Sequence, residues 1–464
     1  MDDRKRIIGL LAGIIIFVLT FILPPPAGMS VAGKNAFGIL IGGIVLWVLN
    51  VFPIAITAFL LMILLPFYGV TPKLADVFKD FISPTIFFLI ATFALTTIIM
   101  KTQLANRLTS VLFKWAHGDS RKIVLGFMLA TAILSSIMSN VPTTALCAAI
   151  AITALQKSVP DMYKSNLVKA VMIGVPYAAV IGGVMTPAGS PNNIMALYLL
   201  EEAAKVHITF LQWMVIGIPV ALITVVVAWL TLIKIFKPEP ITSATLAALQ
   251  ESLGELGPMS GEEKKVVTLI LAMLVLWILS TWVPVLDTTL VALCGLIVMF
   301  LPGINLLTWK EFHRDASWDM ILMIGGIQAV TSGILRSGGA AWVVNTGLAG
   351  AQNWHPLSVL LVASAIMAFL HVLVPAGPPV VGMAVPPMAA LAIKLGVSPV
   401  VMAMIVAVWA NVTFLLPIDM VPLITYSKGY YTAGEMIKAG WFPTLFLIVL
   451  AALLVPVLTA VAGL

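Results

Sequence analysis

The chain has 464 residues, of which 61% are hydrophobic and only 9% charged, with a mean hydropathy of +1.11. About a quarter of the residues of a soluble domain are charged, so this composition excludes a soluble protein and predicts one that spans a membrane. The net charge of +6 therefore concerns the two sides of a membrane and does not indicate a nucleic-acid partner. The two cysteines, Cys147 and Cys294, lie in apolar runs, form no disulfide or metal-binding pattern, and indicate no redox cofactor.

Apolar segments long enough to cross a bilayer, which takes about 20 residues, follow one another through the first half of the chain. We predict helices at 7–23, 35–50, 52–68, 84–100 and 210–235. The segment 102–115 has one apolar face and is expected to lie in the plane of the inner membrane surface. Arg4, Lys5 and Arg6 precede the first helix, which has no cleavage site after it, so we expect it to be retained, with a cytoplasmic N-terminus.

Two longer apolar runs of the first half are interrupted by polar residues and prolines. The run 123–155 is interrupted at Ser139–Thr144 and is predicted to form a re-entrant hairpin that enters and leaves the membrane on one side. The run 167–200 is interrupted at Thr186–Asn193, where two prolines and a glycine cannot continue an ordinary helix. The first half therefore contains a hairpin followed by a broken helix.

The second half repeats this plan after a hydrophilic stretch, Lys237–Lys265, which we interpret as a cytoplasmic linker. We predict helices at 265–283, 286–302, 318–335 and 440–462, an interrupted run at 340–393 and a broken segment at 397–426. The interruptions are Pro375–Pro379 and Leu416–Pro422. The chain is thus divided into first scaffold helices with the interfacial helix (1–118), first-repeat transport elements (119–236), linker (237–264), second scaffold helices (265–337) and second-repeat transport elements (338–464).

About eleven crossings and two hairpins place the C-terminus outside. The positive-inside rule supports this topology, because most of the 25 Lys and Arg residues then lie inside. The exceptions on the outer side are Lys34, Lys73, Lys79, Lys205, Arg336 and Lys394. The two repeats then run in opposite directions across the membrane, and inverted repeats with paired broken segments are typical of secondary transporters.

The four interruptions are expected to share one polar cavity, because non-helical backbone inside a bilayer needs protein, water or ligand partners. Helix N-termini after each break direct N–H groups at this cavity and favour a carboxylate or similar oxyanion. Backbone carbonyls with Ser and Asn oxygens suit a small hard cation such as Na⁺. The sequence therefore predicts a site for an anion and a cation near the bilayer midplane.

The motifs Ser139-Asn140-Val141 and Gly189-Ser190-Pro191-Asn192-Asn193 resemble two motifs of the divalent anion/sodium symporter family, which carries dicarboxylates, citrate and sulfate. The similarity of layout covers nearly the whole chain. It implies an all-α, inverted-repeat elevator-type transporter that pairs through its scaffold faces as a homodimer. It also implies a first sodium site framed by Ser135, Ser139, Asn140 and Gly189.

The same resemblance implies an anion site in the first repeat. Its members are Ser139, Asn140, Val141, Thr143, Ser190, Pro191 and Asn192. In the second repeat we expect a contribution from Ala376, Gly377, Pro378, Asp419, Val421 and Pro422. No ligand other than the anion, the coupling ion and membrane lipid is expected.

The second repeat departs from the family pattern, because Pro375-Ala376-Gly377-Pro378 stands where Ser-Asn-Thr is expected. His371 precedes this tip by about one helical turn, and Asp419 lies in the paired break. Our hypothesis is that His371, as a fixed or titrating cation with Asp419 as its partner, replaces the second sodium. Coupling to protons, to one Na⁺, or to exchange of one anion for another remains open.

Simpler interpretations apply to some of these residues. Thr143, Thr144 and Thr413 also suit helix packing, and a membrane-embedded His is often only hydrogen-bonded to a neighbouring helix.

A channel needs a ring-like selectivity element, and an intramembrane enzyme carries signatures such as HExxH or GxSxG, which this sequence lacks.

We therefore predict a secondary active transporter of C4 or C5 dicarboxylates, working by cation-coupled symport or anion exchange. The expected location is the inner membrane of a bacterium. Alternative substrates are sulfate, a sulfonate or a tricarboxylate, and the alternative function is an anion channel.

Overall fold

The computed structural model describes all residues except 1–2, 157–158, 241–255, 284, 348–349 and 351–353, and the described residues contain helices and no strand. Seven of these helices are long and apolar enough to cross a membrane. They are α1 (Asp3–Ile22), α2 (Val31–Val48), α11 (Phe210–Phe236), α16 (Trp318–Arg336), α18 (Pro356–Leu373), α19 (Gly377–Leu395) and α22 (Ala433–Val461). The all-helical membrane fold predicted from composition is confirmed.

The segment 1–118 contains the helices predicted for it and one additional helix. After α2 come α3 (Ile54–Phe67), α4 (Leu74–Phe81), α5 (Pro84–Met100) and α6 (Leu104–Ala116). α4 and α5 meet at an angle of 46° and together form an eighth candidate span. α4 was not predicted, because its eight residues are amphipathic and too few to give an apolar run. α6 coincides with the predicted interfacial helix.

The predicted hairpins and broken helices are all present. The first hairpin consists of α7 (Ser120–Ser135) and α8 (Asn140–Gln156), and the first broken helix of α9 (Asn166–Gly182), the short 3-10 turn η1 (Pro187–Gly189) and α10 (Pro191–Ala204). In the second repeat, α18 and α19 form the hairpin, and α20 (Pro399–Asn411) with α21 (Met420–Tyr426) forms the broken helix.

The remaining described helices belong to the second half. They are α13 (Gly261–Leu279), α14 (Thr288–Phe300), α15 (Trp309–Asp315), α17 (Gly339–Trp342) and the π-helical turn η2 (Val343–Gly347). α15 and α17 were not predicted, since both are short. Most of the predicted linker, 241–255, lies outside the described residues.

Each break lies a few residues before the position predicted from its prolines. The first hairpin turns at 136–139, so most of the predicted tip, Ser139–Thr144, already belongs to α8. Pro142, Pro191, Pro378 and Pro422 all lie within the first turn of the helix that follows the break. Proline fits there because the first-turn N–H groups have no intrahelical partner, so the non-helical backbone precedes it.

Two helices of the second half begin earlier than predicted because a capping box extends them. Ser260 and Glu263 cap α13, and Thr432 and Glu435 cap α22. In each pair the hydroxyl accepts from the third helical N–H and the glutamate accepts from the backbone N–H of the capping residue. Hydrophobicity alone does not reveal these polar first turns.

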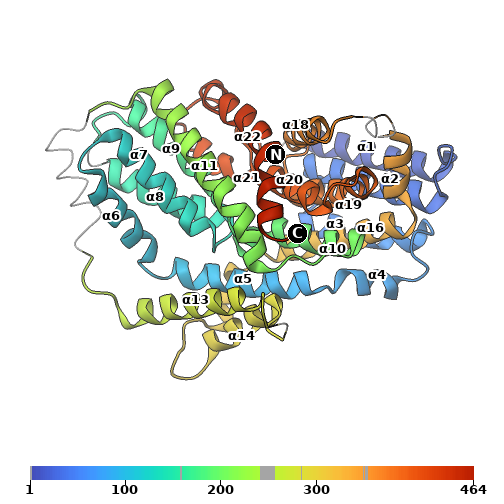
Figure 1. The fold of residues 1–464 in the computed structure, drawn as a ribbon, viewed down its shortest axis with the longest axis horizontal. Coiled ribbons are helices and arrows are strands. Elements are labelled where there is room, and N and C mark those ends of the chain that lie inside the picture. The colour runs from blue at the N-terminus through green and yellow to red at the C-terminus, as the bar shows by residue number, and fades with distance from the viewer. Residues whose placement is uncertain (1–2, 157–158, 241–255, 284, 348–349, 351–353) are drawn as a thin grey trace.

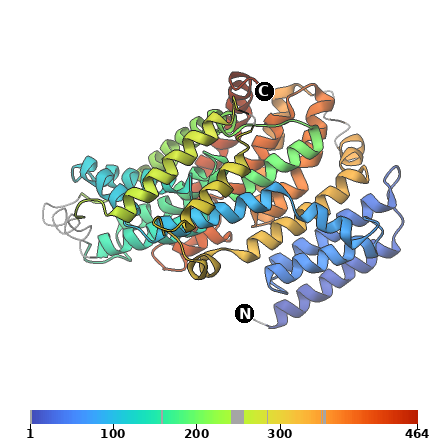
Figure 2. The same cartoon turned by 90° about the horizontal axis from the view of Figure 1, so that it is seen from below.

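The first hairpin and α9 lie at one end of the molecule and α1 to α4 at the other, and the second hairpin lies between them beside α10 and α20 (Figure 1). α7 packs on α9, α19 packs on α10 and α20, and α16 packs on α2 and α3. Figure 2 shows this arrangement from below, with α1 to α3 at one end and the first hairpin at the other.

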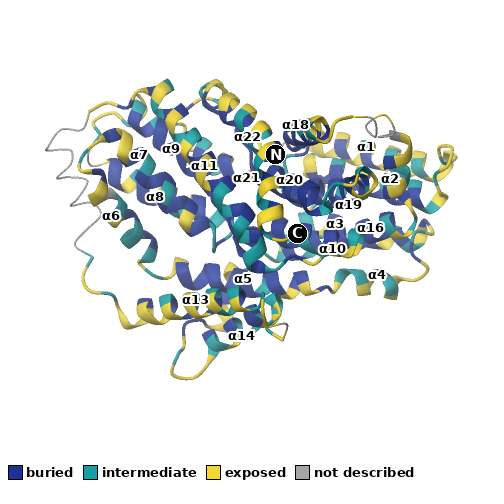
Figure 3. Ribbon diagram, viewed as in Figure 1, coloured by how far each residue is buried: buried dark blue, intermediate teal, exposed yellow. Residues whose placement is uncertain are grey.

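The centre of the molecule is its most buried part (Figure 3). In α20 every residue from Val400 to Asn411 is buried, whereas in α1 only Gly9 and Gly13 are buried. The broken helix of the second repeat therefore lies in the protein interior, where its free backbone groups need protein or ligand partners.

Candidate functional site

The tip of the first hairpin lies directly against the break of the first broken helix. The Thr186 hydroxyl donates to the backbone carbonyl of Ser136. A methyl group at Gly189 would lie 2.6 Å from the Gly183 carbonyl oxygen and 2.8 Å from that of Ser135. The absence of a side chain at Gly189 therefore lets the hairpin and the break meet backbone to backbone.

Asn140, the first residue of α8, joins these two elements. One end of its amide lies 2.9 Å from Ser135 Oγ, and the same end faces the carbonyl oxygens of Ala179 at 3.2 Å and Gly189 at 3.3 Å. With nitrogen at that end the amide donates to both carbonyls. With oxygen there, four oxygen atoms face one another across a buried space, an arrangement that a cation stabilises.

A cluster of buried asparagines connects the two repeats. Asn411, the last residue of α20, donates to Asn193 Oδ1 at 2.8 Å and accepts from Asn192 Nδ2 at 3.2 Å. Asn193 in turn donates to the carbonyls of Gly183 (2.6 Å) and Thr186 (2.8 Å) within the first break. These side chains hold the two broken helices together and satisfy carbonyls that the break leaves free.

The second hairpin tip is built differently from the first. Gly377 begins α19, and a Cβ at this position would lie 2.1 Å from Asn192 Nδ2 and 2.5 Å from the Ala410 carbonyl oxygen. Asn192 Nδ2 donates to that same carbonyl at 2.9 Å. The amide group of Asn192 therefore fills the space that a side chain at the tip would need.

His371 and Asp419 lie side by side in the second repeat. His371 Nε2 is 3.7 Å from Asp419 Oδ2, and both residues are buried. His371 Nδ1 contacts the carbonyl oxygen of Trp409, and the Trp409 indole donates to Ser364 Oγ at 2.7 Å. Asp419 Oδ1 accepts from the Val421 N–H at 3.0 Å and so caps α21. The structure thus brings together the two residues that the sequence proposed as partners.

Several buried polar atoms around the breaks have no hydrogen-bond partner among the described residues. They are Asn192 Oδ1, His371 Nε2 and Thr413 Oγ1. A buried polar atom without a partner costs about 1–3 kcal/mol, so groups of this kind are typical of places where a ligand, an ion or water binds.

The other predicted site residues have more local surroundings. Ser139 and Val141 are partly exposed at the first tip, whereas the hydroxyls of Thr143 and Thr144 donate to carbonyls four residues earlier in α8. Ser190 Oγ accepts from the Asn192 N–H at 3.3 Å and caps α10. Pro191, Val421 and Pro422 are buried in first helical turns, while Ala376 is partly exposed.

A cavity of about 280 Å³ opens beside the second hairpin tip. Val374, Pro375 and Ala376 line it from the tip, and Ile418 and Met420 line it from the second break. Trp47 of α2 and Ile54 of α3, helices predicted to belong to the scaffold, also line it. The cavity therefore lies between the neighbours of Asp419 in the second break, the second hairpin tip, and the helices α2 and α3.

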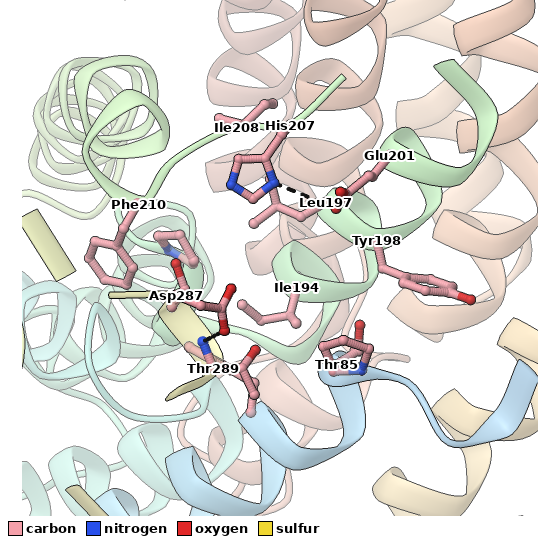
Figure 4. Close-up of a pocket in the computed structure, with 14 residues that line it drawn as sticks. Thr85, Ile194, Leu197, Tyr198, Glu201, His207, Ile208, Phe210, Asp287 and Thr289 are labelled. Carbon is pink, nitrogen blue, oxygen red and sulfur yellow. Dashed lines mark hydrogen bonds and ion pairs between the residues drawn. The ribbon is translucent and has the colours of Figure 1, made fainter. Parts of the chain in front are cut away.

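A second cavity, of about 230 Å³, lies between α10 and the first turns of α5 and α14 (Figure 4). It reaches Pro187 in the first break. His207 Nδ1 lies 3.6 Å from Glu201 Oε2 at its rim, and Asp287 caps α14 by accepting from the Thr289 N–H at 2.8 Å (Figure 4). This cavity separates elements predicted to belong to the transport part from elements predicted to belong to the scaffold.

The sequence did not identify Asn411 or Trp409 as site residues, and it named Asn193 and Gly183 only within longer runs. Asn411 ends the apolar helix α20, and no proline or glycine accompanies it, so no motif marks it. An asparagine at the end of a buried apolar run is itself unusual, because burying an unpaired amide is costly, and this signal identifies Asn411.

The family comparison agrees with this architecture. Residues 4–461 match the family model described as the sodium:sulfate symporter transmembrane region. The chain belongs to this family. Because the match covers almost the whole chain, the resemblance read from the hairpin and break motifs is confirmed.

Among named relatives, the sodium-dependent dicarboxylate transporter SdcS of Staphylococcus saprophyticus is 27% identical, covering 97% of this chain and 91% of the relative. SdcS of Staphylococcus aureus strain USA300 is 26% identical over 97% of this chain and 90% of its own length. The family and these relatives are transporters, so the chain is a transporter of the bilayer and not an enzyme.

Two solved structures share the fold at low sequence identity. MtrF of Neisseria gonorrhoeae is 11% identical, with a TM-score of 0.58 and coverage of 98% of this chain and 94% of MtrF. The YdaH transporter of Alcanivorax borkumensis is 13% identical, with a TM-score of 0.54 and coverage of 82% and 86%. At this identity the likeness concerns the fold alone.

Proposed function

We propose that the chain is a secondary active transporter that carries a small dicarboxylate together with Na⁺ through a site shared by the two repeats. The observation that carries this proposal is the meeting of the first hairpin tip with both broken helices around Asn140, Asn193 and Asn411. The family match and the names of the staphylococcal relatives support the same substrate class and the same coupling ion.

The sodium ion is proposed to bind between hairpin and break of the first repeat. Ser135 Oγ, Asn140 Oδ1 and the carbonyl oxygens of Ala179 and Gly189 supply uncharged oxygen ligands, which a small hard cation prefers. A bound ion also explains why a serine, a glycine and an amide meet at one buried point. In this proposal Ser139, partly exposed at the tip, completes the ligand set.

The anion is proposed to bind next to this ion, at the first turns of α8, α10 and α19. The N-terminus of a helix carries a partial positive charge and free N–H groups, which stabilise a carboxylate. Gly377 and Asn192 place the starts of α19 and α10 in contact, so that two such helix ends lie together. The unpartnered Asn192 Oδ1 and Thr413 Oγ1 lie in the same region and remain available to ligand or water.

The proposed mechanism is an elevator movement within a homodimer. The hairpins and broken helices (119–236 and 338–464) move together against the scaffold helices (1–118 and 265–337), and the scaffold faces pair within the lipid. The N-terminus is proposed to face the cytoplasm and the C-terminus the outside of a bacterial inner membrane, as the distribution of Lys and Arg favours.

Uptake of radiolabelled succinate into proteoliposomes that contain the purified protein tests this function. We expect uptake to be driven by an inward Na⁺ gradient, to be competed by malate and fumarate, and to resist competition by sulfate and citrate. Competition by sulfate or citrate instead of malate places the protein in the alternative substrate class. If none of these anions shows Na⁺-stimulated uptake, the proposal is contradicted.

The Asn140→Ala variant tests the sodium site within the same assay. Loss of the amide oxygen is expected to raise the Na⁺ concentration for half-maximal uptake at least about tenfold, which corresponds to about 1.4 kcal/mol of ion binding. Asn106→Ala, which removes an exposed amide from α6, is the matched control. An unchanged Na⁺ dependence in Asn140→Ala removes this site from the proposal.

A further inference from the structure

His371 and Asp419 form a buried pair that the sodium and dicarboxylate site does not use. His371 is 1% exposed and Asp419 is 8% exposed. An ionisable group at this depth in a membrane costs about 2.5–3.5 kcal/mol even on lenient scales. A buried pair of this kind is therefore expected to have a partner ion or a role in transport.

The hydrogen bonds around His371 determine where its proton lies. A carbonyl oxygen only accepts, so the contact between His371 Nδ1 and the Trp409 carbonyl requires a hydrogen on Nδ1. In neutral imidazole, Nε2 then carries a lone pair and no hydrogen. This lone pair faces the Asp419 carboxylate at 3.7 Å, and no described group donates to it.

One proton resolves this unfavourable contact. Bound at His371 Nε2, it gives an N–H that points at Asp419 Oδ2 and turns two facing acceptors into an ion pair. Asp419 Oδ1 remains bonded to the Val421 N–H, which fixes the carboxylate against α21. The geometry thus provides one defined place for one proton.

Other charged groups do not compete for this place. α20 contains no ionisable residue, and the one ionisable residue of α19, Lys394, donates to Asn345 Oδ1 at its far end. In α22, Glu435 pairs with Lys169 at 2.7 Å and Lys438 is exposed. In α21 the ionisable residue is Tyr426, at its C-terminal end. Among described groups, the Asp419 carboxylate is the ionised partner within 4 Å of His371.

The described residues of the second hairpin tip do not repeat the cation site proposed for the first. Gly377 supplies no side chain where the first repeat has Asn140, and the Asn192 amide occupies that space. Its Nδ2 already donates to the Ala410 carbonyl and to Asn411 Oδ1. The Ala410 carbonyl and Asn411 Oδ1, which could otherwise bind an ion, therefore accept from an N–H donor of the protein itself.

We propose that the His371–Asp419 pair is a proton-binding site, and that one proton crosses the membrane with each substrate anion. The proton binds to Nε2 from the solution on the side where the substrate enters and leaves from Nε2 on the other side. The cavity beside the second hairpin tip, lined by Ile418 and Met420 on either side of Asp419, supplies contact with water. This inference rests on the proposed function.

Coupling follows from the position of His371 six residues before Gly377. A carboxylate at the first turn of α19 and a proton bound at His371 carry opposite charges, which attract each other. Protonation in turn makes the site more favourable for the anion. Binding of proton and anion is therefore mutually reinforcing, as linkage requires.

Proteoliposomes with the pH-sensitive dye pyranine inside test the inference during uptake of labelled succinate. We expect about one proton to enter with each succinate in the wild type, and uptake to fall about fivefold between about pH 6 and about pH 8. His371→Asn retains a donor toward Trp409, and Asp419→Asn retains the cap of α21. Both variants are expected to exchange internal for external succinate without proton movement and to lose the pH dependence.

His207→Asn is the matched control, because His207 also faces a carboxylate, that of Glu201, but on the surface. We expect it to behave as the wild type. Succinate uptake without proton entry in the wild type overturns the inference and leaves the proposed function intact. Wild-type proton entry in both His371→Asn and Asp419→Asn also overturns it. A protein that transports no dicarboxylate overturns the proposed function itself.

Discussion

The close contacts at the breaks depend on individual glycine residues. Gly183, Gly189 and Gly377 each lie where a Cβ would come within 2.6 Å of a neighbouring atom. For Gly189 the neighbouring atoms belong to the backbone, which cannot move aside without displacing the hairpin. The glycine of the motif was predicted as a sodium-site residue, and in the structure its steric role is to admit the hairpin tip.

Gly189→Ala tests this steric role. The added methyl group lies 2.8 Å from the Ser135 carbonyl oxygen at the hairpin tip, so it separates the hairpin from the break, and Na⁺-dependent succinate uptake is expected to fall below about a tenth of wild type. Gly261→Ala at the start of α13, where the Cβ meets nothing within 4 Å, is the control and should transport normally. Wild-type uptake by Gly189→Ala contradicts the packing argument.

Gly377 and Asn192 offer a test by double mutation. Gly377→Ala places a methyl group 2.1 Å from Asn192 Nδ2, and Asn192→Gly removes that amide. Because the two residues share one space, the double variant is expected to lose less thermal stability than the sum of the single variants, by a coupling of about 1–3 kcal/mol. Additive losses in melting experiments on the purified variants show that the contact is absent.

The helices themselves were largely predictable, and the errors lie at their ends. Apolar runs gave α5, α11 and α16 nearly residue for residue, because burial in a bilayer imposes both length and composition. Proline identified each break but placed it too late, since proline is tolerated in a first helical turn. The early starts of α13 and α22 depend on polar capping boxes, which hydrophobicity does not register.

Contacts between distant elements could not be predicted from the sequence. The Tyr177 hydroxyl on α9 contacts the Phe414 carbonyl in the second break at 2.5 Å and the Met436 carbonyl on α22 at 3.0 Å. These two contacts join Tyr177 to residues that lie 237 and 259 positions later in the chain. Nothing in the sequence around Tyr177 marks it, because its role depends on where the other two elements lie.

Tyr177→Phe tests the contribution of this contact. Removal of the hydroxyl leaves the Phe414 carbonyl buried without its partner, which should destabilise the protein by about 1–3 kcal/mol. The melting temperature of the purified variant measures the effect. Tyr163→Phe, which alters a residue that is 63% exposed, should melt as the wild type does, and equal melting of Tyr177→Phe and wild type refutes the proposed contribution.

At the scale of the whole molecule, the inverted repeat explains why residues distant in sequence share one site. Two oppositely directed copies bring their breaks together, and Asn411 of the second repeat contacts Asn140 and Asn193 of the first. The repeat could be read from the sequence, because its hairpins and breaks recur in order. The position of the Asn192 amide in the space beside Gly377 could not, because it depends on packing between the repeats.

Elevator movement predicts that the cavity of Figure 4 changes as the transport part moves. Leu197 on α10 and Thr289 on α14 both line this cavity, and they come from elements that are predicted to move relative to each other. With Cys147→Ala and Cys294→Ser as background, a reducible cross-linker between Leu197→Cys and Thr289→Cys should abolish succinate uptake, and reduction should restore it. Either cysteine alone serves as control. Full uptake by the cross-linked protein contradicts relative movement of these elements.

The central claim is that the two repeats build one site in which Na⁺ and a dicarboxylate bind together. An experimental structure of the protein in Na⁺ and succinate tests it most directly. The account predicts an ion between Ser135 Oγ, Asn140 Oδ1 and the carbonyls of Ala179 and Gly189, with succinate at the adjoining starts of α8, α10 and α19. Succinate bound away from both hairpin tips, with the Asn140 amide nitrogen facing those carbonyls and no ion between them, contradicts it.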